Sequence, residues 1–424
     1  MSVEPLRVLV VLPMYGGSLP IGTYCVQALR DLGHTAAVFD APAFYGAFSA
    51  LKGTGVTTDR LEQLESGFLQ VISQAILAQV ETFEPDMVLA LAQAPMSRQL
   101  LRRLSREGVP TAMWFVEDYK VFTYWRAFAP LYDVFAVIQK EPFLGELTAI
   151  GQNHALYLPM AALPSFHTPA QLSAADTRYY GADVAFVGAG YPNRRVAFRA
   201  LAHKDFKIWG TEWEGESALA AHVQQGGARI SPEDCVKIYT ATRINLNLHS
   251  SVQCRDLVPG GDFVNPRTFE LAAMGAFQLV DGRTLMPELF DAGMLPTFSS
   301  VEEMLEKIDY YLAHPEERAA CATLARERVL QRHTYQHRMR QLLEHMRACV
   351  PGMARMRAQK GFPEEFPEAL RQPLQDLLRT LSLPADAPFE DVILRLRLRT
   401  GRLTELETSL LFLDEWRKQY TKKQ

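Results

Sequence analysis

The sequence predicts an α/β protein with two tandem Rossmann-like domains and a helical C-terminal extension. Short apolar runs alternate with helical stretches over residues 1–165, and the same alternation resumes over residues 182–350. Alternation of this kind gives parallel sheets with helices on their faces. Between the two halves the chain is rich in Pro, Ala and Ser without a clear period, so we place an interdomain linker at residues 166–181. Residues 351–424 differ in character and are predicted to form the helical extension.

The first half reads as one doubly wound domain. A buried apolar run and a glycine-bearing turn with Gly16, Gly17 and Gly22 lead into a helix that Gly33 stops, and a second strand follows. This βαβ unit implies a parallel sheet. Strands are expected at residues 7–12, 35–39, 87–91, 110–116, 134–138 and 155–158, and helices at residues 21–32, 61–83 and 97–107.

The second half repeats the alternation. Strands are expected at residues 183–187, 206–209, 243–248 and 277–280. Helices are expected at residues 194–202, 265–275, 299–312 and 314–346, and a further helix is expected to start at Ser231. Ser299 with Glu302 is a capping box for the helix at residues 299–312. Pro315 and Glu316 after His314 start the helix at residues 314–346.

The composition narrows the class of protein. With 48% hydrophobic and 22% charged residues the chain is ordinary for a globular protein, and its net charge of −4 gives no reason to expect nucleic acid as a partner. Five cysteines without a C-x-x-C pair argue against a disulfide framework or a structural zinc site; they are Cys25, Cys235, Cys254, Cys321 and Cys349. No signal peptide or membrane span is visible in the sequence, so we expect a cytoplasmic enzyme.

The most informative stretch runs from Asn265 to Asp281. Asn265 is a good N-cap, Pro266 suits the first helical position, and Gly275 ends the helix before a short buried strand. Arg267 in the first turn faces the positive end of the helix dipole, which normally costs about 0.3–1 kcal/mol, so an anion should compensate. Either Glu270, three residues on, or a bound phosphate fills that role.

A second candidate anion site is the turn from Gly188 to Arg195, which follows a predicted strand and opens a helix. Its glycines let backbone approach a ligand, Asn193 can cap the helix, and Arg194 and Arg195 lie where a helix dipole favours an anion. It is not a dinucleotide fingerprint, because Asn193 replaces the third glycine of G-x-G-x-x-G. Both helix starts should lie at the carboxyl ends of parallel strands.

These stretches, taken in order, resemble the CgeB/YkvP-type glycosyltransferase family. The resemblance covers roughly residues 183–346, and the first half matches loosely, mainly at residues 114–118. The segments that carry it are Phe186-Val187-Gly188 with Pro192-Asn193-Arg194-Arg195, then residues 244–249, 265–270, 310–318, 325–330 and 333–335.

The resemblance implies a GT-B fold, in which the C-terminal domain holds a nucleotide-diphosphate sugar and the N-terminal domain holds the acceptor. It implies that Glu270 holds the ribose or sugar of the donor, and that Arg194, Arg195 and Arg267 lie near the diphosphate. The chain contains no D-x-D sequence, which agrees with a metal-independent enzyme that uses the nucleotide sugar as co-substrate and no other cofactor. The expected donor-binding residues are Gly188, Tyr191, Asn193, Arg194, Arg195, His249, Asn265, Arg267, Thr268 and Glu270.

Catalysis between two such domains needs a general base on the acceptor hydroxyl or assistance from the donor phosphate. Asp118 follows a predicted strand and should emerge at its carboxyl edge, so it is the candidate base beside Glu270; a helix cap or a solvated loop carboxylate is the other interpretation. Gly16 and Gly17 could let a substrate approach the backbone, or form a plain tight turn. The acceptor itself, whether glycan, protein or small molecule, cannot be read from the sequence.

Other interpretations stay open at this stage. A GT-B scaffold can bind a nucleotide sugar without activity and act through partners, since fold does not fix function. An NAD-dependent first domain, with Asp40 as ribose ligand, is disfavoured because Gly17 and Gly22 have the wrong spacing. In the tail, Phe389, Leu396, Leu403 and Leu410 are spaced by seven residues, so a coiled-coil homodimer competes with helices packed on the globular body.

Overall fold

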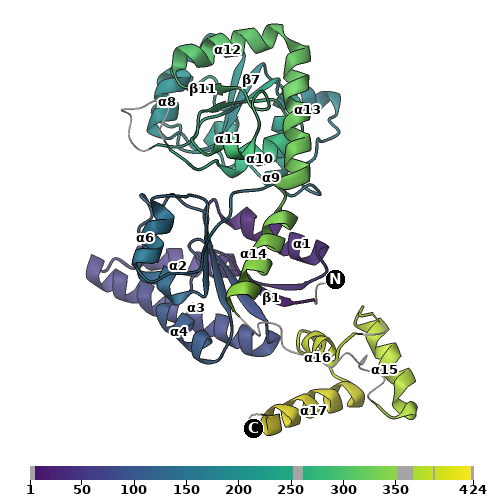
Figure 1. Cartoon of the computed structure of the whole chain (residues 1–424). Coiled ribbons are helices and arrows are strands. Elements are labelled where there is room, and N and C mark those ends of the chain that lie inside the picture. Colours follow the sequence, from purple (N-terminus) through teal and green to yellow (C-terminus); the bar gives the residue numbers. More distant parts are fainter. Residues whose placement is uncertain (1–4, 252–260, 351–365, 385–386, 422–424) are drawn as a thin grey trace. The chain divides into compact units, whose positions relative to one another are not determined.

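The computed structural model describes residues 5–251, 261–350, 366–384 and 387–421, so Cys254 lies outside the described residues. The chain divides into two compact units (Figure 1). The larger unit contains both sheets. The smaller unit contains the C-terminal helices together with residues 77–84.

The first sheet has six parallel strands in the order β2-β1-β3-β4-β5-β6. In β1, the second strand of this order, Val8 lies opposite Ala36 on one side and Met87 on the other. The strands are β1 (Arg7–Val11), β2 (Thr35–Phe39), β3 (Met87–Leu91), β4 (Thr111–Phe115), β5 (Val134–Val137) and β6 (Ala155–Tyr157). The helices of this part are α1 (Leu19–Asp31), α2 (Tyr45–Ala50), α3 (Thr58–Phe83), α4 (Arg98–Arg106), α5 (Trp125–Phe128) and α6 (Phe143–Ala149).

The second sheet has five parallel strands in the order β11-β10-β9-β7-β8. They are β7 (Val184–Val187), β8 (Phe206–Trp209), β9 (Ile244–Asn247), β10 (Gln278–Asp281) and β11 (Thr297–Phe298). The helices in this half of the chain are α7 (Ala174–Tyr180), α8 (Pro192–Phe198), α9 (Pro232–Ala241), α10 (Pro266–Ala273), α11 (Met286–Leu289), α12 (Val301–Ala313), α13 (Pro315–Arg332) and α14 (Tyr335–Cys349). Two parallel sheets with covering helices confirm the predicted fold class.

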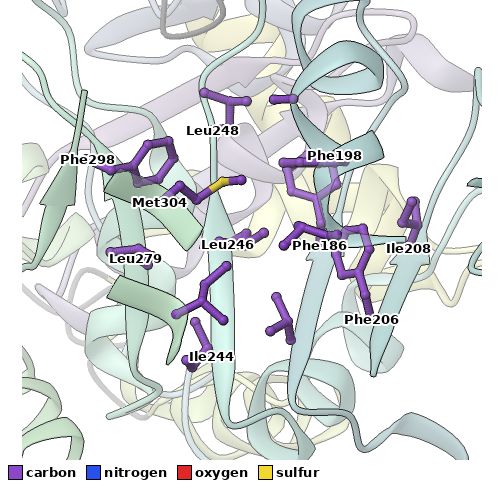
Figure 2. Packing of buried hydrophobic residues seen from close by; sticks show 14 of the residues in the cluster. Phe186, Phe198, Phe206, Ile208, Ile244, Leu246, Leu248, Leu279, Phe298 and Met304 are labelled. Atoms are coloured by element: carbon purple, nitrogen blue, oxygen red, sulfur yellow. The ribbon is translucent and has the colours of Figure 1, made fainter. Parts of the chain in front are cut away.

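Alternating side chains of the second sheet bury both of its faces, as a parallel sheet requires. On one face, Phe186, Ile208 and Leu246 pack against helix residues such as Phe198 (Figure 2). The rings of Phe186 and Phe198 have centroids 4.9 Å apart. On the other face, Val187 and Trp209 pack against residues of α9 and α10, which include Ile238 and Leu271. Helices α9 and α10 are therefore seated on the sheet by apolar contact.

In both sheets the strand order reverses beside the first strand of the domain. The reversal falls between β1 and β3 in the first sheet and between β7 and β9 in the second. Ligands of open α/β sheets bind outside the carboxyl ends of the strands at such reversal points. The turns that follow these four strands are therefore the places to search for a site.

Three local predictions were wrong. The proposed linker contains α7, because Ser173 and Asp176 form a reciprocal capping box that starts a helix. The predicted helix from 314 to 346 breaks at His333, where Thr334 caps the new helix α14, and α14 packs against α1 and β5 of the first sheet. The N-cap of α12 is Ser300 rather than Ser299, since the Ser300 hydroxyl accepts the Glu303 N–H.

The seven-residue repeat of the tail does not lie along one helix. The described part of the tail forms α15 (Glu368–Thr380), α16 (Phe389–Arg397) and α17 (Glu405–Thr421). Leu403 falls in the connection between α16 and α17, where Gly401 has a positive φ of 111°. Phe389, Leu396 and Leu410 are buried together within the smaller unit. Burial in this core accounts for their apolar character without a coiled-coil partner.

Replacing Phe198 by Ala tests this packing. The ring is fully buried, so the Phe198→Ala variant should lower the free energy of unfolding of this domain by about 3–5 kcal/mol. Val196→Ala, on the exposed side of the same helix, is the matched control and should change it by about 0.5 kcal/mol or less. Urea unfolding followed by circular dichroism measures both. Equal effects of the two substitutions would contradict the core shown in Figure 2.

Candidate functional site

A cavity of about 450 Å³ lies at the reversal points of the two sheets. The turn after β1 contributes Gly16 and Gly17, and the turn after β7 contributes Gly188. Helices α9 and α10 contribute the larger side chains. The remaining lining residues that matter below are Tyr24, His167, Tyr239, Arg267 and Glu270. Of the predicted site residues, the structure brings Gly16, Gly17, Gly188, Arg267 and Glu270 together here.

Glycine is required where the turn after β7 passes the turn after β8. Gly188 has φ of 151°, and a Cβ there would lie 3.0 Å from the Phe186 ring. Gly210 has φ of 119°, and a Cβ there would lie 2.7 Å from the carbonyl oxygen of Gly188. The two backbones thus touch, and together they form one wall of the cavity.

The polar residues that follow Gly188 bind the protein's own backbone. Asn193 is fully buried, and its Nδ2 donates to the carbonyl of His249 at 2.9 Å. Arg194 Nε donates to the Leu248 carbonyl at 2.9 Å, and Nη1 donates to the Ala189 carbonyl at 3.0 Å. Burial, and after it the charge of Arg267, lower the pKa of Arg194 to about 9. These contacts tie the turn after β7 to the end of β9.

Arg195 and Tyr191 also lie outside the lining of the cavity. Arg195 donates from Nε to the Gly190 carbonyl at 2.6 Å and from Nη1 to the Glu214 carbonyl at 2.7 Å. Tyr191 is the N-cap of α8, and its ring faces the guanidinium of Arg194 at 5.3 Å. The carbonyl bonds hold both guanidinium groups against the main chain, outside the lining of the cavity.

The amino end of α10 is held by a network of buried amides. The side chain of Asn265 accepts the Thr268 N–H at 3.0 Å, as a helix cap should. Asn265 Nδ2 donates to Asn247 Oδ1 at 2.8 Å, and Asn247 Nδ2 donates to the Thr268 hydroxyl at 2.9 Å. Gln278 Nε2 donates to the Thr268 carbonyl at 2.8 Å. Asn265 and Thr268 therefore build the helix start and do not line the cavity.

His249 connects this network to Asp281 on β10. Its Nδ1 lies 2.7 Å from Oδ1 of Asp281, and its Nε2 accepts the main-chain N–H of Asn265 at 3.0 Å. With one nitrogen donating and the other accepting, the imidazole is neutral and its tautomer is fixed. Burial lowers the pKa of His249. Burial alone would raise the pKa of Asp281. The contact with His249 and the charge of Arg283, whose Nε lies 3.2 Å from Asp281 Oδ2, outweigh burial and lower the pKa of this carboxyl. His249 thus has no nitrogen left for a donor phosphate.

Arg229 and Arg267 both line the cavity; Arg229 is exposed, whereas Arg267 is partly buried and held by its neighbours. Arg267 Nε donates to the Tyr239 hydroxyl at 3.0 Å, and its guanidinium carbon lies 5.5 Å from the centroid of the Phe186 ring. Burial opposes the charge, but Tyr239 and then Glu270 more than offset it and raise the pKa of Arg267. Among the described residues, Nη1 and Nη2 have no hydrogen-bond partner. The cation is therefore oriented by its neighbours while its outer nitrogens stay available.

Glu270 lies one helical turn from Arg267 and faces a histidine that the sequence did not single out. His167 Nε2 is 3.8 Å from Glu270 Oε1, and His167 Nδ1 accepts the Leu163 N–H at 2.9 Å, so Nε2 carries the proton. Tyr24 packs edge-on against His167 at 4.9 Å between centroids. Burial raises the pKa of Tyr24 and lowers that of His167. No pattern marked Tyr24, His167 or Tyr239 because each belongs to an element remote in sequence.

Asp118 does not line this cavity. Its Oδ1 accepts the Lys120 N–H at 2.9 Å, the arrangement of a loop carboxylate that stabilises its own turn. The neighbouring Glu117 points to a different network: Oε2 accepts the Tyr124 hydroxyl at 3.0 Å, and burial raises the pKa of Glu117.

Over the described residues, no group of three or more His, Cys, Asp or Glu side chains could hold a metal ion. Within the same residues, no helix is both long and apolar enough to cross a membrane.

Comparison with known proteins shows which proteins the chain resembles. Residues 174–344 match the family model described as glycosyl transferase-like. The spore protein CgeB of Bacillus subtilis (strain 168) is 24% identical over 257 residues, which are 58% of this chain and 78% of that protein. This chain is thus similar to CgeB and contains a glycosyl transferase-like region. The resemblance seen in the sequence is confirmed, and the matched stretch includes β7, β9 and α10, which surround the cavity.

Solved structures agree on the fold. A glycosyltransferase from Rickettsia africae is 12% identical and superposes with a TM-score of 0.55, over 82% of this chain and 100% of that one. HepE from Anabaena, in complex with UDP and glucose, is also 12% identical, with a TM-score of 0.56 over 81% of this chain and 100% of that one. At such identities the likeness shows the GT-B fold alone, as predicted.

The neutral state of His249 gives a prediction for pH. In the folded protein its pKa is lowered, whereas the unfolded chain takes up a proton below about pH 6.5. The unfolded state then binds more protons, so stability is present above that pH and is lost as the pH falls, by up to about 1.4 kcal/mol per pH unit for one group. The His249→Gln variant should therefore show a smaller drop in urea midpoint between pH 7 and pH 5 than the wild type.

The matched control for this experiment is His203→Gln, which removes an exposed histidine. The two variants are compared by their pH dependence rather than by their absolute stability, because His249→Gln also disturbs the cap of α10. An equal pH dependence in wild type and His249→Gln would contradict a neutral His249.

Proposed function

We propose that the chain transfers a sugar from a nucleotide-diphosphate sugar to an acceptor hydroxyl, in the cleft between its two Rossmann-like domains and without a metal ion. The observation that carries this proposal is the cavity in which an oriented cation, Arg267, lies beside a carboxylate, Glu270, at the start of one helix. Such a pair matches the two ends of a nucleotide sugar, the anionic diphosphate and the hydroxyl-bearing ribose or sugar.

In the proposed step, the acceptor oxygen forms a bond to the anomeric carbon of the donor sugar. The bond from that carbon to the diphosphate oxygen breaks, and its electron pair leaves with the nucleoside diphosphate. The hydroxyl proton of the acceptor passes to the departing diphosphate or to solvent base, so charge and atoms balance. Arg267 would stabilise the negative charge that grows on the leaving oxygen, because a fixed guanidinium in a partly buried site needs little reorganisation.

The site also supplies places for the uncharged parts of the donor. Gly188, with backbone at the cavity wall, leaves room for a ligand to approach closely. Glu270 can accept hydrogen bonds from two neighbouring hydroxyls, and His167 Nε2 lies 3.8 Å from its Oε1. HepE, which has the same fold, was solved with UDP and glucose, which supports a uridine nucleotide as the first donor to test.

Replacement of Arg267 by Ala should remove most of the stabilisation that a bound nucleotide gives. A thermal-shift panel of UDP, GDP, dTDP, ADP and CMP with their sugar conjugates should raise the Tm of the wild type for one nucleotide class. A ligand at a hundred times its Kd adds about 2.7 kcal/mol of stability. The Arg267→Ala variant should lose most of this shift because the diphosphate loses its charge partner.

Arg243→Ala is the matched control for that panel. It removes one positive charge from the same domain, but Arg243 pairs with Asp183 at the amino end of β9, away from the cavity. The control should keep the full shift. A shift retained in Arg267→Ala, or lost equally in both variants, would contradict the assignment of the diphosphate to Arg267.

Removal of the carboxylate should abolish transfer. Glu270→Ala should lower turnover of the nucleotide sugar by at least about 100-fold, a loss of roughly 2.7 kcal/mol, while circular dichroism and Tm stay close to wild type. Glu302→Ala, an exposed acid in the first turn of α12, is the control and should keep full activity. Release of nucleoside diphosphate measures both. A folded Glu270→Ala variant with near-normal turnover would exclude a role for this carboxylate.

A further inference from the structure

A second cavity lies on the other side of the turn after β1. Its volume is about 540 Å³, within the range of small-molecule sites. Tyr15 faces this second cavity, whereas its neighbour Gly16 faces the first one. The lining is largely aromatic and apolar, with residues from the turns after β1, β3 and β4 and from α2 and α3. The side chains used below are Met14, Tyr15, Phe48, Gln93, Phe122, Tyr124 and Phe128.

A closed ring of hydrogen bonds holds Gln93 at the edge of this cavity. The Gln93 N–H donates to the Tyr124 hydroxyl at 2.9 Å, and that hydroxyl donates to Glu117 Oε2 at 3.0 Å. Gln93 Nε2 donates to the other oxygen of Glu117 and closes the ring. All three groups are partly buried, so each bond is shielded from water.

The ring holds Gln93 in a conformation that a residue with a side chain rarely adopts. Its φ is 64°, in the left-handed region, which costs a residue other than glycine on the order of 1 kcal/mol. Strain of this kind persists where neighbouring contacts fix the residue, and it is concentrated at ligand sites. The strained residue follows β3, beside β1, at the point where the strand order of the first sheet reverses.

Gln93 lines the second cavity, and its side-chain oxygen lies near a residue that lines the first. Gln93 Oε1 is 3.7 Å from the position that a Cβ on Gly16 would take, and Gly16 lines the first cavity. Among the described residues, no donor is bonded to this oxygen, whereas Nε2 of the same amide is taken by Glu117. An acceptor atom of the second cavity's lining thus lies close to Gly16 of the first, and Gly16 has no side chain to separate them.

We propose that this second cavity binds the acceptor, and that the acceptor is a compound with an aromatic or extended apolar body and a hydroxyl group that donates to Gln93 Oε1. This inference rests on the proposed function, because it places the acceptor hydroxyl next to the donor cavity. The apolar body packs among Tyr15, Phe122 and Phe128. The transfer step is the one described above, and Gln93 positions the hydroxyl without taking its proton.

A pair of simple glycosides tests this proposal on the full chain. p-Nitrophenyl β-D-glucoside and methyl β-D-glucoside differ only in the aromatic group. Their binding is measured by saturation-transfer NMR titration without nucleotide, and again with any nucleotide that the thermal-shift panel selects. The p-nitrophenyl compound should bind about tenfold more tightly, since a ring that packs against aromatic side chains contributes on this order. Equal affinity of the two compounds would overturn the proposal.

Two variants locate the binding. Phe122→Ala removes a partly exposed wall residue and should weaken binding of the p-nitrophenyl compound about fivefold. Gln93→Gly removes the amide at a position whose positive φ suits glycine. The main-chain bond to Tyr124 is kept, the bond from Nε2 to Glu117 is lost, and the acceptor hydroxyl loses its partner. Gln93→Gly should weaken binding of both glucosides. Tyr310→Ala removes an exposed tyrosine of α12 outside both cavities and should change neither.

Unchanged affinity in both Phe122→Ala and Gln93→Gly would place the acceptor elsewhere and overturn the proposal. Failure of acceptor binding in the second cavity can be told apart from failure of the donor function. Absence of any nucleotide-induced Tm shift in the wild type would count against the donor function, whereas the glucoside affinities report on the second cavity alone.

Discussion

The rest of the site depends on the buried polar network that fixes the amino end of α10. One imidazole, His249, links a carboxylate on β10 to the main-chain N–H of the helix cap Asn265. Asn247 on β9 then bonds both the cap and Thr268. Asn247, His249, Thr268 and Asp281 are buried, and Asn265 is partly buried. Because all are hydrogen-bonded, loss of one partner would leave buried polar groups unpaired at a cost of about 1–3 kcal/mol each. The network therefore defines a single position for the first turn of α10, and with it the positions of Arg267 and Glu270.

Arg194 and Arg267 have different roles in this site. Arg194 is held by carbonyl oxygens at the end of β9 and joins the turn after β7 to the strand beside it. Arg267 is held at Nε alone, by Tyr239, and rests near the face of Phe186, which is itself a core residue of the second sheet. The contact with Phe186 and the hydrogen bond to Tyr239 together fix the position and orientation of the Arg267 guanidinium. A rigid cation of this kind suits a charge that forms during bond breaking.

The sequence predicted the alternation of strands and helices, the cap at Asn265 and the family, because these follow from local patterns. It did not predict that Thr334 starts a new helix, since the break depends on packing of α14 against α1. At the site, Arg267 and Glu270 could be found because they share one helix turn. His167, Tyr24 and Tyr239 could not, since only the folded chain brings them to the cavity. Conversely, Arg195 and His249 looked like ligand residues in sequence, but the structure engages their polar atoms with backbone and carboxylate.

The central claim is that a nucleotide-diphosphate sugar binds with its diphosphate on Arg267 and its hydroxyls on Glu270. A crystal structure of the wild-type chain with the nucleotide sugar selected by thermal shift tests this most directly. The account predicts diphosphate oxygens within about 3 Å of Arg267 Nη1 or Nη2 and a ribose or sugar hydroxyl at similar distance from Glu270. A nucleotide bound outside this cavity, or one whose diphosphate contacts Arg195 while Arg267 keeps only Tyr239, would contradict it.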